Sequence, residues 1–197
     1  ISENINLQNI DNIDLLKKFL LSKNFISDSN TVFYEGSIKA DLMVIGDKPD
    51  DIKVKNGRPF HGELEKLLDA MLKAIGFDKR NTYYTNLRCN PKKIDINLDL
   101  ELEIKKKQIL IVEPKIIIMF GAEATRLLTN NEDSIFKSRG HWYDINIDDN
   151  LEPVLGISMF HPRYILAHPE SKKETWKDLK EVRSKFTWFK LYFFMSM

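Results

Sequence analysis

Apolar positions along the chain follow two patterns, unbroken runs of strand length and repeats of helical spacing. Residues 41–46, 115–121 and 153–160 form apolar runs, and residues 82–86 have the composition of a further strand. Runs of this kind are typical of parallel strands that are buried on both faces. From Glu63 to Ile75, apolar residues recur at i, i+3, i+4 and i+7, which predicts an amphipathic helix.

Shorter segments complete the predicted order of elements. A second long helix is expected over residues 98–112, ended by Pro114. The remaining segments are a helix over 12–24, a short strand over 31–36, a short helix over 122–128, a strand or hairpin arm over 141–147 and a closing helix over 174–186. Strands that alternate with helices indicate crossover connections and a parallel sheet. The sequence therefore predicts an α/β fold: a three-layer α/β/α sandwich with a central, mainly parallel four-stranded sheet.

Length and composition bound the domain organisation. The chain has 197 residues, 43% of them hydrophobic, which is enough for one domain with a full core. We expect a single domain over residues 1–197, with an N-terminal helical extension over 1–30 and an aromatic C-terminal tail over 187–197. The tail is too short to span a bilayer. We expect it to cover the core beside the last helix, with a partner-docking surface as the lesser alternative.

Cysteine content and charge narrow the class of protein. Cys89 is the only cysteine, which excludes an internal disulfide and a four-cysteine metal site within the chain. This fits a reducing cytoplasm, and no apolar run reaches the roughly 18 residues of a membrane span. We therefore expect a cytoplasmic monomer with no membrane partner. The net charge of +1 neither requires nor excludes nucleic acid, because binding one extruded base needs only a local basic rim.

Polar side chains stand where the predicted strands end. Asp47 follows the first apolar run, Asn86 ends residues 82–86, and His161 follows the last strand. In parallel sheets, the ligand site lies beyond the carboxyl ends of the strands. Each residue alone has an ordinary explanation: Asp47 as a helix cap, Asn86 as a turn residue, His161 as a loop residue and Phe60 as a hydrophobic staple. Together they supply an acid, an amide, an imidazole and an aromatic ring, a set suited to a planar heterocycle and its glycosidic bond.

The order of short motifs resembles the uracil-DNA glycosylase superfamily, and most of all its family 4 type. The chain contains, in the family's order, "GDKPD", "GRPFHG", "YYTN", "EPKIIIMFGAEA", "SRGHWY" and "FHPRYILAHP". A "WKDL" run in the closing helix is similar to the family's last helix. Each fragment is weak, but six in order over about residues 32–186 make a specific signal.

The resemblance implies a role for each site residue. Asp47 and His161 would be catalytic, with Asp47 orienting water or stabilising the cation-like sugar, and His161 stabilising the departing base. Gly46, Phe60 and Asn86 would bind the base, with Phe60 stacking on it and Asn86 reading its edge. A side-chain amide offers a donor and an acceptor, which suits uracil and disfavours cytosine.

The resemblance also implies a DNA-binding rim around the site. The loop after His161 enters DNA in relatives, so Ile165 or Leu166 would fill the gap left by the flipped base. Candidate phosphate contacts include Lys172 and Lys173. The DNA-binding residues expected from the resemblance are Arg139, Arg163, Tyr164, Ile165 and Leu166.

Three departures separate this chain from the family pattern. Family 4 enzymes typically hold an iron–sulfur cluster on four cysteines, and Cys89 falls near only one of those positions, so we expect no cluster, no other metal and no cofactor. Asp47 is one methylene shorter than the usual glutamate. Asp50 replaces the second glycine of the first motif, and Lys53 stands near an expected acidic residue.

We therefore expect a monofunctional DNA glycosylase that hydrolyses the N-glycosidic bond of uracil in DNA, with other deaminated bases left open. Uracil-containing DNA is the expected partner. The alternative is a catalytically weak or inactive nucleic-acid-binding protein on the same fold, marked by the altered first motif. A third reading, a small-nucleotide-binding α/β protein, lacks its usual glycine-rich loop, because "GDKPDD" has neither dinucleotide-binding nor P-loop spacing.

Overall fold

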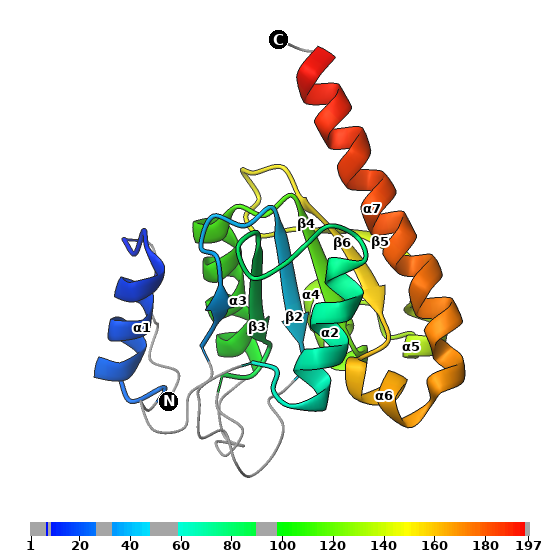
Figure 1. Cartoon of the computed structure of the whole chain (residues 1–197). Helices are drawn as coiled ribbons and strands as arrows, with labels where there is room; N and C mark the ends of the chain where they lie inside the picture. Colours follow the sequence, from blue (N-terminus) through cyan, green and yellow to red (C-terminus); the bar gives the residue numbers. More distant parts are fainter. Residues whose placement is uncertain (1–6, 8, 27–32, 48–58, 90–97, 196–197) are drawn as a thin grey trace.

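A six-stranded sheet forms the centre of the computed structural model, which describes residues 7, 9–26, 33–47, 59–89 and 98–195 (Figure 1). The strands are β1 (Glu35–Gly36), β2 (Leu42–Gly46), β3 (Thr82–Asn86), β4 (Ile116–Phe120), β5 (Trp142–Ile145) and β6 (Val154–Met159). Their order across the sheet is β1-β3-β2-β4-β6-β5. The four central strands are parallel, as predicted.

The predicted strand count of four is wrong, because both edges carry a short antiparallel strand. β1 pairs with β3 over only two residues, and β5 pairs with β6 over four. β5 is followed along the chain by its partner β6, so the two form a hairpin without a crossover. The sheet is therefore mixed, and its parallel centre is the part that the apolar runs predict.

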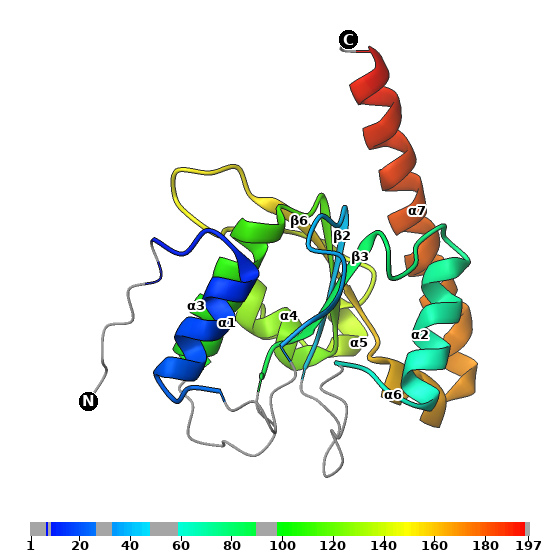
Figure 2. The same ribbon diagram turned by 60° about the vertical axis from the view of Figure 1, so that its left-hand side comes forward.

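One face of the sheet is covered by three helices, α1 (Ile13–Ser22), α3 (Leu98–Val112) and α4 (Ala122–Thr129). Figure 2 shows α1 and α3 on this side, with the sheet seen nearly edge-on. Their apolar faces pack with alternate strand residues such as Met43 and Ile45 in one core cluster. The alternation follows from the two-residue period of a strand.

The other face carries α2 (Glu63–Lys73), α6 (Pro162–Ala167) and α7 (Lys172–Met195). These helices pack with the intervening strand residues, including Leu42 and Val44. The three-layer α/β/α arrangement is thus present. A four-residue helix, α5 (Ile135–Ser138), and a 3-10 turn, η1 (Pro169–Ser171), complete the chain.

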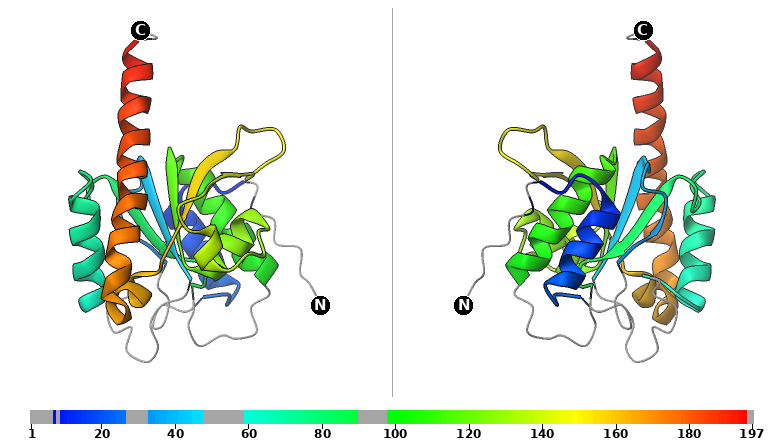
Figure 3. Two further views of the ribbon diagram at one scale, coloured as in Figure 1. Left: turned by 90° about the vertical axis from the view of Figure 1, so that its right-hand side faces the viewer. Right: turned by 90° about the vertical axis from the view of Figure 1, so that its left-hand side faces the viewer.

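The C-terminal tail differs from its prediction as core cover. α7 is a single helix of 24 residues, and its last turns stand clear of the sheet in both views of Figure 3. Trp188, Leu191 and Tyr192 are more than half exposed, while Phe189 still packs against the core. The sequence lacks a helix-stopping glycine or proline in this segment, so the helix continues past the end of the sheet.

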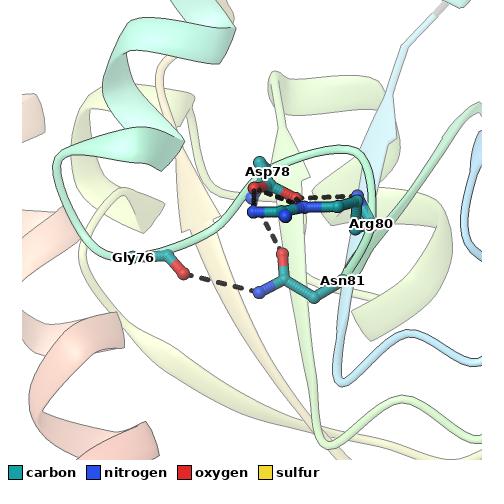
Figure 4. A network of polar contacts seen from close by, with 4 residues as sticks. All are labelled: Gly76, Asp78, Arg80 and Asn81. Atoms are coloured by element: carbon teal, nitrogen blue, oxygen red, sulfur yellow. Dashed lines mark hydrogen bonds and ion pairs between the residues drawn. The ribbon is translucent and has the colours of Figure 1, made fainter.

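Polar contacts fix the turn between α2 and β3 (Figure 4). The Asp78 carboxylate accepts from the backbone and side chain of Arg80, and the Asn81 side chain bonds to the backbone of Asp78 and Gly76. This turn sets the start of β3, and so the register that brings Asn86 to the far end. Within the described ranges, no helix is long and apolar enough to cross a membrane.

Candidate active site

The carboxyl ends of β2 and β3 bring the first candidate residues together. Gly46 and Asn86 are partners in the parallel ladder, and Leu87 N donates to Gly46 O at 2.7 Å. A Cβ added to Gly46 would lie 2.5 Å from Asn86 Oδ1 and 2.9 Å from Phe60 Cζ. Only glycine fits at this point, because two other side chains already occupy the space above it.

Phe60 and Asn86 are coupled through the segment that precedes α2. Asn86 Nδ2 donates to Pro59 O at 2.8 Å, which fixes the amide orientation. Asn86 is fully buried, yet its Oδ1 has no hydrogen-bond partner among the described residues. Buried acceptors without partners are uncommon in folded proteins, so Oδ1 is a point where a ligand hydrogen bond would fit.

His161 stands at the end of β6 and caps α6. Its Nδ1 accepts from Arg163 N at 3.1 Å, so in the neutral ring the proton is on Nε2. Nε2 is buried and, within the described part of the chain, has no partner. The ring centroid lies 6.1 Å from that of Phe60. Burial lowers the pKa of His161 to about 4, so the ring is neutral at pH 7 and offers one unpaired N–H donor.

Asp47 follows Gly46 and reaches across to the start of α4. Its Oδ1 accepts from Ala124 N at 2.7 Å, so the carboxylate caps that helix. Gly121 has φ 102°, and a Cβ there would overlap the Asp47 carboxylate. Burial is the main cause that raises the pKa of Asp47 to about 6. The negative charge of Glu123 raises this pKa further, whereas the backbone N–H groups of α4 and the positive charge of Arg163 lower it.

The structure therefore brings Asp47, Phe60, Asn86 and His161 to one edge of the sheet, as the sequence predicts. The ordinary explanation of Asp47, a local cap or turn residue before "KPDD", concerns a segment outside the described residues, and the contact that the structure does give Asp47 is with the first turn of the distant helix α4. Gly46 lies among these side chains. The family substitutions at Asp50 and Lys53 fall outside the described residues.

On α6, the residues after His161 separate into a buried and an exposed set. Arg163 and Leu166 are exposed, and Leu166 has 39% of its surface accessible. Tyr164 is half-buried and stacks on His168. Ile165 is fully buried in the core between α6 and the sheet, so the prediction that it could serve as a DNA wedge is wrong. The helical turn places adjacent residues on different faces, which leaves Leu166 as the candidate wedge.

Arg139, expected to contact phosphate, has a structural role instead. Its guanidinium pairs with the buried Asp178 carboxylate, donates to Glu174 O at 3.0 Å and lies 5.5 Å above the Phe160 ring. Gly140 has φ 76°, and a Cβ there would lie 2.8 Å from Asp178 Oδ1. The "RG" and "WKDL" motifs therefore meet in a single contact that joins the segment before β5 to α7.

The surroundings of Cys89 do not fit an iron–sulfur cluster. Its thiol is buried, and burial raises its pKa to about 11. The Lys105 ammonium is fully buried beside it and donates to Cys89 Sγ at 3.2 Å, Thr85 Oγ1 at 3.2 Å and Gln108 Oε1 at 2.7 Å. A cation with three donors fills this space, and the chain has no second cysteine.

Two features near the site were not anticipated from the sequence. Phe136 on α5 is 64% exposed and packs edge-on against the Phe160 and Tyr164 rings, beside the candidate DNA rim.

The second feature is an ion pair next to Asp47, formed by Arg88 and Glu123 although they are 35 positions apart. A charged residue just past the end of a central strand is the only signal that could have pointed to Arg88.

Comparisons with known proteins agree with this geometry. The profile of the uracil DNA glycosylase superfamily matches residues 33–180. The type-4 uracil-DNA glycosylase of Sulfurisphaera tokodaii is 30% identical over 88% of this chain and 84% of its own length, and that of Saccharolobus solfataricus is 30% identical over 88% and 86%. The type-4 enzyme of Archaeoglobus fulgidus is 28% identical over 75% and 77%. The chain belongs to the uracil-DNA glycosylase superfamily.

Proposed function

We propose that this chain excises uracil from DNA by hydrolysing its N-glycosidic bond. The relatives are named type-4 uracil-DNA glycosylases, hydrolases of that bond. The observation that carries the proposal is a pair of buried atoms, Asn86 Oδ1 and His161 Nε2, which lie beside the Phe60 ring and have no hydrogen-bond partner among the residues that the structure describes. An acceptor, a donor and an aromatic surface match the hydrogen-bonding edge, the O2 atom and the face of an extruded uracil.

Base recognition in this proposal depends on the amide orientation. Because Asn86 Nδ2 donates to Pro59 O, Oδ1 is the atom free to accept from uracil N3–H. The second Nδ2 hydrogen is available to uracil O4. Cytosine has an unprotonated N3 and an amino group, so both contacts would be lost and two buried groups left unpaired. Hypoxanthine has a carbonyl beside an N–H, as uracil does, which makes it the first other deaminated base to test.

The bond-breaking step would use the neutral His161 and the charged Asp47. As the bond from C1′ to uracil N1 breaks, its electron pair leaves with the base, and the negative charge spreads to O2. The His161 Nε2–H donor would stabilise that charge, and no proton transfer is needed because a depressed pKa keeps the ring neutral. The Asp47 carboxylate would stabilise the positive sugar and orient the water whose oxygen bonds to C1′. The proton that this water loses would go to Asp47 or solvent, and the departed base would take up a proton to become neutral uracil.

The products would be free uracil and an abasic site with an intact strand. A lyase step needs an amine that attacks C1′, and the buried Lys105 ammonium already donates to three protein acceptors. We therefore propose a monofunctional enzyme, acting on DNA as a monomer.

One observation favours the alternative of an inactive nucleic-acid-binding protein. The Asp47 side chain is shorter than the family glutamate and is held by the α4 amide of Ala124, so it caps a helix as well as facing the site. On that alternative, uracil-containing DNA would bind without release of the base.

The test is incubation of the protein with uracil-containing single-stranded and duplex oligonucleotides, followed by alkaline cleavage at abasic sites. We expect cleavage that depends on the protein and falls by 10²-fold or more in Asn86→Ala and His161→Ala variants. Lys115→Met, at the opposite end of the sheet, is the control. Tight binding with no abasic product in the unmodified protein would select the alternative.

A further inference from the structure

Asp47 is held in a closed ring of contacts formed by three elements. Arg88 N, just past β3, donates to Asp47 O at 3.2 Å. The Arg88 guanidinium donates twice to Glu123 Oε1, from Nε at 3.0 Å and from Nη2 at 2.5 Å. Glu123 is in the first turn of α4, next to Ala124, whose N–H donates to Asp47 Oδ1. Both the backbone and the side chain of Asp47 are therefore fixed relative to one ion pair.

The charges around Asp47 come from each element packed against it. Glu123 on α4 is a nearby negative charge that raises the pKa of Asp47, and Arg163 on α6 is a cation that lowers it, while Arg88 is the ion-pair partner of Glu123. His161 is neutral. The Arg88 and Glu123 side chains are only about a quarter exposed, at 26% and 25%, so solvent screens their pairing less than it screens a surface pair.

We propose that the Arg88–Glu123 ion pair is a positioning device for the reaction, which holds Asp47 at the site and controls whether its carboxyl group is charged at neutral pH. Glu123 alone would oppose ionisation of a second carboxyl group nearby. Arg88 neutralises Glu123 and so keeps Asp47 ionised. The cap from Ala124 fixes where that charge lies.

This role follows from the short side chain at position 47. A carboxylate that is tied to a helix terminus cannot adjust its position, so the nearby charges can only adjust a protonation equilibrium that burial has already shifted. The inference rests on the proposed function for its catalytic consequence. The protonation state of Asp47 itself can be measured without any activity.

The experiment uses the full chain and four variants: Arg88→Met, Glu123→Gln, the double variant, and Lys115→Met as the matched control. Lys115 pairs with Asp41 at the amino ends of β2 and β4, far along the strands from Asp47. The titration of the Asp47 carboxyl carbon is followed by NMR, and the pH dependence of kcat/KM is measured on a uracil-containing oligonucleotide.

Arg88→Met leaves Glu123 unneutralised, so the Asp47 titration and the acid limb of kcat/KM should both move to higher pH, by roughly one unit. Glu123→Gln removes the negative charge and leaves the guanidinium uncompensated, so both should move to lower pH. The double variant should return towards the unmodified protein, and Lys115→Met should change neither.

Shifts in the same direction for both single variants, or no shift in either, would overturn the proposal. A purely structural ion pair would lower stability in both variants without opposite pH shifts. If Arg88→Met does not fold, Arg88→Lys provides the second test, because it keeps the charge and should keep the titration near its original midpoint. Absence of glycosylase activity would refute the proposed function, yet the NMR titration would still decide this inference.

Discussion

At the scale of single residues, the site contains two titratable groups whose pKa values burial shifts in opposite directions. Burial raises the pKa of Asp47 to about 6 and lowers that of His161 to about 4, so at pH 7 the acid is charged and the imidazole is neutral. Both shifts disfavour the charged form, as desolvation requires. The result is one anion and one neutral donor at the same edge of the sheet, the combination that the proposed reaction needs.

Asp47→Asn should stabilise the protein at pH 7 while reducing activity. The pKa of Asp47 is higher in the folded state than in the unfolded chain, so its ionisation opposes folding as pH rises from about 4 to above 6. Removing that charge should increase the free energy of unfolding by up to about 3 kcal/mol at pH 7.

Urea unfolding of both proteins at pH 4, 5 and 7 checks this prediction. The difference between variant and unmodified protein is the relevant quantity, because His161 has the opposite pH dependence and is present in both. The stability gain should shrink as pH falls towards 4. A constant difference across the range would show that Asp47 is not the group responsible.

At the scale of elements, α6 divides its residues between the core and the candidate DNA surface. Ile165 is buried and Leu166 is exposed, although they are neighbours in the sequence. The helical geometry alone decides which of the two can enter DNA.

The two neighbouring substitutions should therefore have different effects. Ile165→Ala should lower the free energy of unfolding by about 2–5 kcal/mol, because it creates a core cavity. Leu166→Ala should leave stability within about 0.5 kcal/mol and reduce kcat/KM on duplex more than on single-stranded DNA, since only a duplex leaves a gap to fill. Thermal unfolding and the two activity measurements distinguish these outcomes, and equal loss on both substrates would argue against the wedge.

Helix α3 is joined to the end of β3 by the buried Lys105. Two of its three hydrogen bonds reach Thr85, one residue before Asn86, and Cys89, three residues after it, and the third reaches Gln108 on α3 itself. An ammonium group with its donors satisfied thus ties down the segment in which family 4 enzymes use a cysteine ligand.

Lys105→Met should lower the free energy of unfolding by about 1–3 kcal/mol, because it leaves several buried acceptors without a donor. Lys106→Met, on the next position of α3 with a more exposed side chain, is the control and should have little effect. Denaturant unfolding measures both. Treatment with an iron chelator should change neither stability nor activity, and a loss on chelation would contradict the assignment of this space to Lys105.

At the scale of the whole molecule, a buried ion pair joins the last helix to the segment before β5, in addition to the apolar packing of that helix against the core. Arg139, before β5, and Asp178, on α7, are 39 positions apart and meet beneath Phe160. Two motifs that the family shares are therefore explained by assembly of the fold.

Arg139→Met should therefore affect mainly the stability of the fold, and Arg163→Met should affect mainly DNA binding. Arg139→Met leaves the Asp178 carboxylate buried without its cation and should cost about 3–5 kcal/mol of stability. Arg163→Met, on the exposed face of α6, should cost much less stability than Arg139→Met and lower the salt dependence of DNA binding by about one unit of slope. Fluorescence anisotropy at several salt concentrations measures DNA binding by both variants, and thermal unfolding measures their stability. A stable Arg139→Met variant with weakened DNA binding would contradict the structural role of Arg139.

Sequence patterns alone determined the parallel centre of the sheet, the main helices and the four side chains at its edge. The reason is that apolar runs, helical spacing and residues after strand ends are local signals with direct structural meaning. Strands were also expected over residues 31–36 and 141–147, but a local pattern does not record which strand pairs with which, so the sheet itself was predicted with too few strands.

The tertiary structure decided which of the candidate residues are free to act. Arg139 and Ile165 were expected to contact DNA, yet a distant carboxylate holds the partly buried Arg139, and the packing of a short helix buries Ile165 completely. The pairing of Arg88 with Glu123 and the contact of Asp47 with Ala124 arise only when β2, β3 and α4 meet. The same holds for the buried atoms of Asn86 and His161 that have no partner within the described part of the chain. Burial and hydrogen-bond pairing depend on contacts between segments far apart in the chain, and no local pattern records them.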